Sequence, residues 1–90
     1  MVFYTYILKS KKTGKYYKGH TSDLSIRLDQ HNKGKTKSTK SGIPWSVVYY
    51  ERYSSREEAI LREKYFKTAS GRRYIKSLNL DSSVGGSLPE

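Results

Sequence analysis

The run of aromatic and aliphatic residues at positions 3–8 constrains the fold of this chain more than any other feature. A nearly continuous apolar segment of this length, bounded by turn signals, is typical of a largely buried strand. Residues 11–14 have the composition of a hairpin turn, and residues 15–20 form the returning strand. Because 90 residues suffice for only one small core, we expect one domain over residues 1–80. The Ser/Gly-rich residues 81–90 have little to bury and are expected to be disordered.

A helix, a basic loop and a third strand are predicted after the hairpin. Thr21 or Ser22 can cap the helix, and Gly34 fits its C-terminal stop. Residues 33–42 hold four lysines and no apolar residue, which predicts a mobile basic loop. Residues 45–53 are rich in Val and Tyr, and we expect them to form the third strand.

Two more helices are predicted in the last third of the chain. Ser55 and Glu58 have the spacing of a capping box, which opens a second long helix that runs to about Thr68. Gly71 and the serine before it interrupt the helical pattern. Residues 72–78 are then expected to form a short third helix.

The charge balance indicates a polyanionic partner. The chain has 18 Lys and Arg against 8 Asp and Glu, a net charge of +10, and every basic residue lies at or before Lys76. Nucleic acid is favoured over a membrane surface, because no segment is apolar enough to span a bilayer and no basic helix carries a wide uninterrupted apolar face. The alternative is that the charge serves only solubility. The absence of cysteine from the sequence excludes disulfides, thiolate zinc sites and cysteine nucleophiles, and it fits a reducing cytoplasm.

One carboxylate stands where a core residue is expected. The apolar stripe of the second long helix consists of Ala59, Ile60 and Phe66, and Glu63 falls in its middle. Desolvating an unpaired carboxylate costs several kcal/mol, so Glu63 is expected to border a cleft and to face a positive group, for which a divalent metal would fit. The alternative is a salt bridge to Arg62, Lys67 or an arginine elsewhere.

The tyrosines of the predicted hairpin form a second candidate cluster. Tyr4 and Tyr6 share one face of the first strand, while Tyr17 and Gly19 share one face of the second. Tyrosine is also a good strand former with an apolar body, so each ring alone can be structural. Gly19 adds weight to a functional role, because glycine inside a short strand often marks the close approach of a ligand or another backbone.

Arg27 and His31 form a third cluster, one turn apart on the first helix. The planar guanidinium suits a phosphate, and an imidazole beside it could contact phosphate or move a proton. Basic residues one turn apart are also common on solvated helix faces.

These segments together have the spacing of a known family. The residues concerned are Tyr4-Thr5-Tyr6, Tyr17-Lys18-Gly19, His20-Thr21-Ser22-Asp23-Leu24, Arg27-Leu28, His31-Asn32, Pro44-Trp45 and Glu63. Over about residues 3–76 the chain resembles the GIY-YIG nuclease domain, above all the small stand-alone bacterial members, which are similar to the N-terminal catalytic domain of the excision-repair nuclease. The resemblance implies an α+β fold with a small three-stranded antiparallel sheet flanked by helices in the order β-β-α-β-α-α, and an active site on one sheet face.

The resemblance also implies roles for individual residues. Tyr6 and Tyr17 match the tyrosines of the two triplets, Arg27 the catalytic arginine, His31 a polar active-site position and Glu63 the metal-binding glutamate. The first triplet lacks its glycine, and Lys18 and His20 depart from the second triplet and its flank.

The implied reaction is metal-assisted hydrolysis of DNA phosphodiester bonds. Glu63 would hold one Mg²⁺ or Mn²⁺ ion, which keeps several waters and takes other ligands from the phosphate. Tyr17 would help to remove the proton of the attacking water, Tyr6 would orient water or phosphate, and Arg27 would stabilise phosphate charge. His20 or His31 could assist proton transfer. The lysines expected to hold the nucleic-acid backbone are Lys18, Lys33, Lys35, Lys37 and Lys40.

The sequence therefore predicts a structure-selective or weakly sequence-specific DNA endonuclease in the cytoplasm, with a role in DNA repair and no membrane association. Its substrate could be branched or single-stranded DNA, and a protein partner could supply specificity. The first alternative is a non-catalytic nucleic-acid-binding module on the same fold. The second is an adaptor whose exposed tyrosines and Trp45 bind protein.

Overall fold

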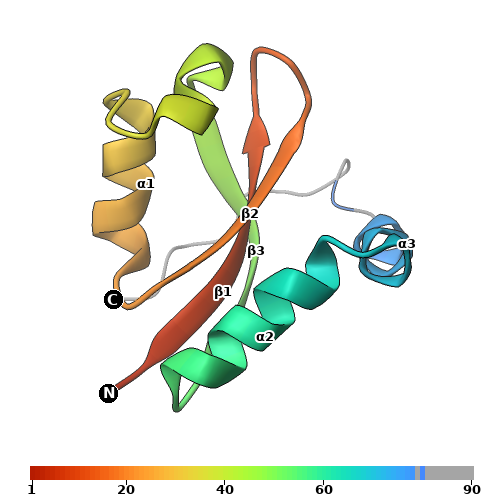
Figure 1. The fold of residues 1–90 in the computed structure, drawn as a ribbon. Helices are drawn as coiled ribbons and strands as arrows, with labels where there is room; N and C mark the ends of the chain where they lie inside the picture. Colours follow the sequence, from red (N-terminus) through yellow and green to blue (C-terminus); the bar gives the residue numbers. More distant parts are fainter. Residues whose placement is uncertain (79, 81–90) are drawn as a thin grey trace.

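β1 (Phe3–Ser10) is the middle strand of a three-stranded sheet in the computed structural model, which describes residues 1–78 and 80 (Figure 1). β2 (Tyr16–Thr21) and β3 (Trp45–Tyr53) flank it, and both run antiparallel to it. The predicted α+β fold and element order are confirmed. The apolar run of β1 is explained by this position, because helices cover both faces of a central strand and leave all of its residues from Phe3 to Leu8 nearly buried.

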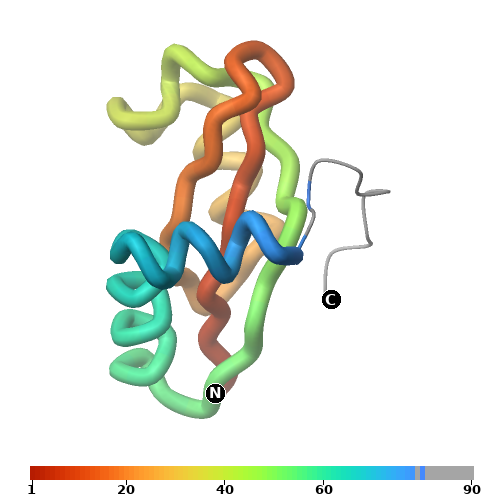
Figure 2. Tube along the Cα trace, turned by 90° about the vertical axis from the view of Figure 1, so that its right-hand side faces the viewer, coloured from red at the N-terminus to blue at the C-terminus, as the bar shows by residue number. Residues whose placement is uncertain are grey.

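The helices divide between the two faces of the sheet. α1 (Leu24–Asn32) covers one face, and α2 (Arg56–Phe66) and α3 (Ala69–Ser77) cover the other (Figures 1 and 2). Successive side chains of a strand point to opposite faces, so β1 feeds two cores. Tyr6 packs with Leu24 beneath α1, whereas Ile7 packs with Phe66 and Ile75 beneath α2 and α3.

The ends of α1 show which side chains control the helix. Asp23 is the N-cap, because its carboxylate accepts a hydrogen bond from the backbone N–H of Ile26 at 3.0 Å. The prediction of Thr21 or Ser22 as the cap was therefore wrong, and Thr21 instead accepts from the N–H of Asp23 at 3.1 Å. At the other end Gly34 has a φ of +76°, as expected of a glycine that stops a helix.

Two further expectations about local structure need correction. Residues 33–42 contain a 3₁₀ helix, η1 (Lys37–Gly42), whose Thr39 is buried, so the basic segment is not an unstructured loop. Gly71 does not break the chain between two helices but lies within α3, which begins at Ala69 and is capped by Thr68. A Cβ at Gly71 would overlap the backbone of the last turn of α2, so glycine permits the close approach of the two helices.

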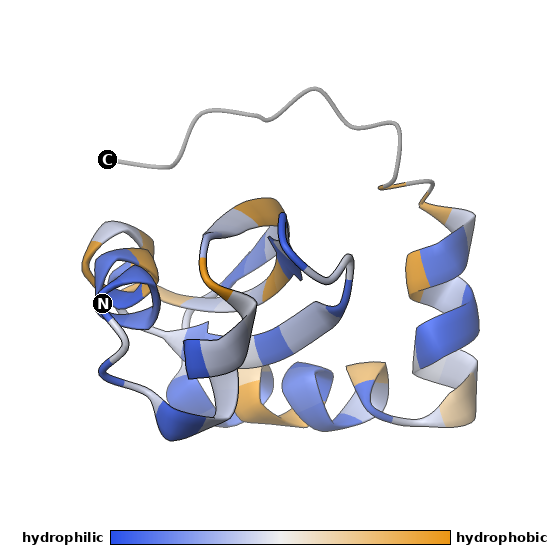
Figure 3. Ribbon diagram, turned by 90° about the horizontal axis from the view of Figure 1, so that it is seen from above, coloured by the Kyte–Doolittle hydropathy of each residue, from blue (hydrophilic) through white to orange (hydrophobic). Residues whose placement is uncertain are grey.

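Hydrophilic positions interrupt the hydrophobic ones along the helices (Figure 3). Among the described residues, no helix has both the length and the hydropathy needed to cross a bilayer. The predicted disorder of residues 81–90 lies outside the described residues.

Candidate functional site

Tyr6 is the start of a buried chain of hydrogen bonds beneath α1. Its hydroxyl lies 3.0 Å from Nε2 of His31, and Nδ1 of His31 lies 2.8 Å from the hydroxyl of Thr39. Thr39 donates its own proton to the carbonyl of Thr36 at 3.3 Å. The Thr39 oxygen must then accept from Nδ1–H of His31, so Nε2 is free to accept from the hydroxyl of Tyr6. The network thus assigns both the tautomer of His31 and the direction of the Tyr6 proton.

Burial keeps the side chains of Tyr6 and His31 neutral in this hydrogen-bond network. Desolvation raises the pKa of Tyr6 to about 12, although a hydrogen bond from Arg27 and its charge oppose the rise; Tyr17 and Glu63 add to it. Desolvation lowers the pKa of His31 to about 4, and the Arg27 charge adds to this. The Tyr6 oxygen accepts from the guanidinium while its proton goes to the imidazole. At neutral pH this hydrogen-bond network is therefore uncharged, and it orients the side chains of Tyr6 and His31.

Glu63 lies on the opposite face of the sheet, on α2, with both carboxylate oxygens engaged. Nδ1 of His20 lies 2.7 Å from Oε1, and the ammonium of Lys67 lies 2.8 Å from Oε2. Burial raises the pKa of Glu63, but the hydrogen bonds from Lys67 and His20 outweigh this and bring it below its ordinary value. With 17% of its side chain exposed, Glu63 is a mostly buried, ionised carboxylate that faces positive or donating groups.

The salt-bridge alternative for Glu63 is realised in part. Lys67 is its partner, whereas Arg62 instead binds Glu51 of β3 at 2.8 Å. Lys67 has 54% of its side chain exposed, so this ion pair can open toward solvent at low cost.

Site residues of the two faces come closest together in β2, which is an edge strand. Gly19 pairs with Tyr6, and His20 pairs with Thr5, so consecutive residues of β2 serve opposite faces. A Cβ at Gly19 would lie only 2.5 Å from the Tyr6 hydroxyl. The group that approaches Gly19 is thus a phenol of the same protein, where we expected a ligand or another backbone. The bare backbone of Gly19 lets Tyr6 reach the edge of the sheet, where Glu63 influences its pKa.

Tyr17 and Arg27 complete the α1 side of this region. The Tyr17 ring packs edge-on against His31, with centroids 5.1 Å apart, and against Trp45 at 6.3 Å. Arg27 donates to the side chain of Gln30 at 3.1 Å in addition to its hydrogen bond with Tyr6. Tyr17 and Arg27 are both half-buried, so they can meet a ligand that the fully buried His31 cannot reach.

The lysines predicted to hold nucleic acid do not form one group. Lys33 to Lys40 follow α1 and extend through η1, and the four lysines there are exposed. Lys33 also pairs with Asp29 at 2.9 Å. Lys18 is paired with Ile7 of β1, so its side chain lies on the face covered by α2 and α3. Likewise the candidate site residues come from both faces of the sheet, in contrast to the expectation of a site on one face.

Two polar residues that support the site were given no role by sequence reasoning. Thr39 fixes the His31 ring, yet it stands in a lysine-rich segment with no periodic pattern that could mark it as buried. Asn32 accepts from the backbone N–H of Trp45 at 2.6 Å and donates to its carbonyl at 3.0 Å, which holds the end of α1 against the start of β3. Asn32 stands beside His31 in the family pattern, which could have marked it as important, but the pattern gave it no role.

The donor set at Glu63 can be tested against a metal ion. The described residues contain no group of three or more His, Asp or Glu side chains that could enclose one. Glu63 and His20 offer one carboxylate and one imidazole, a set too small for structural zinc. One carboxylate does fit Mg²⁺ or Mn²⁺, which keep several waters and bind phosphate oxygens.

Comparison with known proteins shows to which family this chain belongs. The family model of the GIY-YIG catalytic domain matches residues 2–79. The chain belongs to the GIY-YIG family. The GIY-YIG family is a family of nucleases, which supports a nuclease-type role for this member in general.

The relatives of this GIY-YIG protein are themselves small. A UPF0213 protein of Staphylococcus haemolyticus is 40% identical over 76 residues, which are 83% of this chain and 92% of that protein. A UPF0213 protein of Bacillus pumilus is 35% identical over 85 residues, 90% of this chain and 86% of the relative. The solution NMR structure of a UPF0213 protein from Bacillus halodurans matches with a TM-score of 0.54 and 33% identity, over 92% of this chain and 88% of that one. The similarity thus extends over most of the length of each of these relatives.

Proposed function

We propose that this protein is a divalent-metal-dependent endonuclease that hydrolyses DNA phosphodiester bonds with structure selectivity or weak sequence preference. The observation that carries the proposal is the position of Glu63, a mostly buried carboxylate beside His20 at the edge strand whose other face holds Tyr6. A role in DNA repair in the cytoplasm is part of the proposal, and so is a protein partner that supplies specificity, because a domain this small offers little surface for recognition.

Each side chain of the region has a task that its surroundings support. Arg27 is held by Tyr6 and Gln30, so its guanidinium is oriented to neutralise charge on a phosphate. Tyr17 is half-buried, so its hydroxyl can first release its own proton to solvent, and as the phenolate it would take the proton of the attacking water. His31 does not touch the substrate; it positions the phenol of Tyr6 through a neutral hydrogen bond.

Glu63 would hold Mg²⁺ or Mn²⁺, which when bound polarises the phosphate and lowers the pKa of a coordinated water. To make room, Lys67 would turn toward solvent, which its exposure allows. His20 would remain beside the carboxylate, where it fixes the orientation of Glu63 and can pass a proton to the leaving oxygen.

A cleavage assay tests the proposal. The protein would be incubated with branched, nicked and single-stranded DNA in the presence of Mg²⁺ or Mn²⁺. Glu63→Gln keeps the shape of the side chain and removes its charge, and it should abolish cleavage. Glu57→Gln, an exposed carboxylate in the first turn of the same helix, is the matched control and should cleave normally. Failure of the wild type to cleave any of the substrates, or equal activity of Glu63→Gln, would refute the proposal.

One observation favours the second candidate, a non-catalytic nucleic-acid-binding module. Lys67 already neutralises Glu63, so the described residues form a stable arrangement without an ion. The two candidates differ in metal uptake. Titration with Mn²⁺ should broaden the NMR resonances of Glu63 and His20 in a nuclease and leave them unchanged in a module that only binds.

A further inference from the structure

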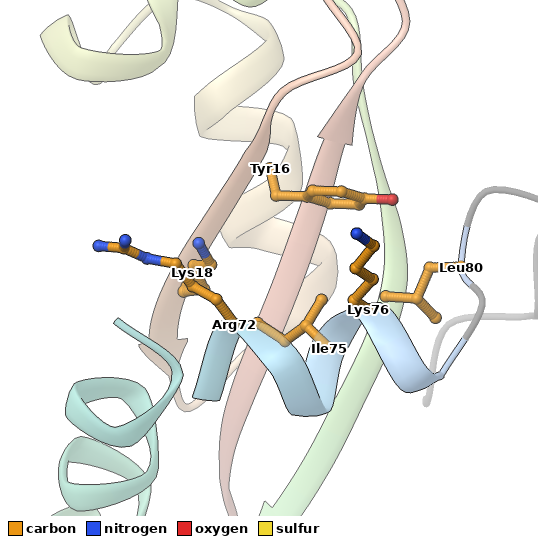
Figure 4. A pocket seen from close by; sticks show the side chains of 6 residues that line it. All are labelled: Tyr16, Lys18, Arg72, Ile75, Lys76 and Leu80. Atoms are coloured by element: carbon orange, nitrogen blue, oxygen red, sulfur yellow. The ribbon is translucent and has the colours of Figure 1, made fainter. Parts of the chain in front are cut away.

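A separate cavity lies on the other side of β2 from the Tyr6 chain, between β2 and α3 (Figure 4). Its volume is about 340 Å³, within the range of small-molecule sites. The residues that line it are Tyr16, Lys18, Arg72, Ile75, Lys76 and Leu80. Apart from Lys18, none of these residues has a part in the proposed nuclease chemistry.

The cations of this cavity lack an anion. Among residues 1–78 and 80, neither Lys18 nor Lys76 makes a salt bridge, and Arg72 donates only to the backbone carbonyl of Lys67 at 3.2 Å. Burial lowers the pKa of Lys18, and the charges of Arg72 and Lys67 lower it further. Lys18 and Arg72 therefore repel each other, and an anion bound between them would relieve this repulsion.

The other walls of the cavity are apolar, and one of them is a planar aromatic ring. Ile75 and Leu80 are nearly buried, and Tyr16 packs against the same core. In Figure 4 the Tyr16 ring lies across the cavity from Ile75 and Lys76. A ligand suited to these walls has a planar apolar body and a negatively charged end, because aromatic rings bind planar groups by stacking and clustered cations bind phosphate.

We propose that this cavity binds a nucleotide, with the base between Tyr16 and Ile75 and the phosphate beside Lys18 and Arg72, whose cationic ends lie at the same end of the cavity in Figure 4. A nucleotide within a strand is favoured over a free one, because Lys67 lies near Lys18 and pairs with Glu63, so the cavity adjoins the candidate metal ligand. That part of the inference rests on the proposed nuclease function; nucleotide binding itself does not.

NMR titration of the full chain at low salt, without divalent metal, measures binding apart from cleavage. The probes are inorganic phosphate, thymidine, thymidine 5′-monophosphate and a short oligothymidylate. The nucleotide and the oligomer should shift the methyl resonances of Ile75 and the ring resonances of Tyr16, which form the apolar walls of the cavity. A stronger effect of the oligomer assigns the site to a strand, and an equal effect assigns it to free nucleotides.

Matched variants locate the binding. Arg72→Gln should weaken oligomer binding about tenfold, whereas Arg73→Gln, the neighbouring exposed arginine with the same charge loss, should have a much smaller effect. Tyr16→Leu retains apolar bulk and should weaken binding roughly tenfold through the loss of stacking, provided its melting temperature shows a folded protein.

Several outcomes would overturn the inference. These are no shift at Ile75 and Tyr16 with nucleotide, the same shifts with inorganic phosphate alone, equal losses in Arg72→Gln and Arg73→Gln, or shifts produced by anionic lipid vesicles but not by nucleotides. The cleavage assay is judged separately. Shifts without any cleavage leave the nucleotide site standing and refute the nuclease, and cleavage without shifts does the reverse.

Discussion

As pH falls, this protein should begin to lose stability before its carboxylates are protonated, because the imidazole of His31 is buried. The pKa of His31 falls from an ordinary value of 6.5 to about 4 in the folded chain. Between these values the unfolded chain binds a proton that the folded chain refuses, so the free energy of unfolding rises with pH there and is lost as pH falls. With about 1.4 kcal/mol for each pH unit between the two pKa values, the full loss is about 3 kcal/mol, and about 2 kcal/mol of it has occurred at pH 5.

Urea unfolding followed by the fluorescence of Trp45, the only tryptophan, measures this loss at about pH 8, 7, 6 and 5. Glu51 and Glu63 have lowered pKa values, so their contributions are lost only as pH falls below the ordinary carboxylate range, and they do not mask the effect of His31. His31→Gln can still accept from Tyr6 but cannot titrate, and its stability should be lower at pH 8 yet nearly flat down to pH 5. A wild type with flat stability over this range, or a His31→Gln variant with the full slope, would contradict the reasoning.

Three more perturbations test the packing and the resting state of the site. Gly19→Ala places a methyl group against the hydroxyl of Tyr6 and should destabilise the protein by roughly 1–3 kcal/mol in the same urea assay; an unchanged midpoint would mean that the phenol moves freely. Lys67→Gln removes the cation that competes for Glu63 and should tighten Mn²⁺ binding several-fold in calorimetric titration, whereas weaker binding would show that Lys67 assists the metal. Glu51→Gln leaves a partly buried guanidinium without its carboxylate and should cost about 2 kcal/mol of stability, as measured by denaturant unfolding.

The sequence predicted the sheet well because the strands carry their pattern locally. β3 was expected at 45–53 and is found at Trp45–Tyr53, and the run at 3–8 lies within β1. The predicted N-cap at Ser55 was also found, since Ser55 accepts from the N–H of Glu58 at 3.3 Å. These elements depend on residues within one or two turns of each other, where spacing is informative.

What the sequence could not predict depends on contacts between distant segments. Gly71 looks like a helix breaker until the backbone of α2 is placed against it. Thr39 looks solvated until His31 needs an acceptor for its Nδ1–H. The position of Glu63 on an apolar stripe correctly indicated a partly buried carboxylate, but no local pattern could choose between His20, Lys67 and Arg62 as its partners.

The alternation of β2 has a consequence for how the two layers of the protein are kept distinct. Its odd-numbered residues Tyr17 and Gly19 serve the α1 layer, and its even-numbered residues Lys18 and His20 serve the other. A slip of one residue in pairing would send every side chain to the wrong layer. The hairpin turn between β1 and β2 sets this register, so it decides which residues of β2 enter which layer.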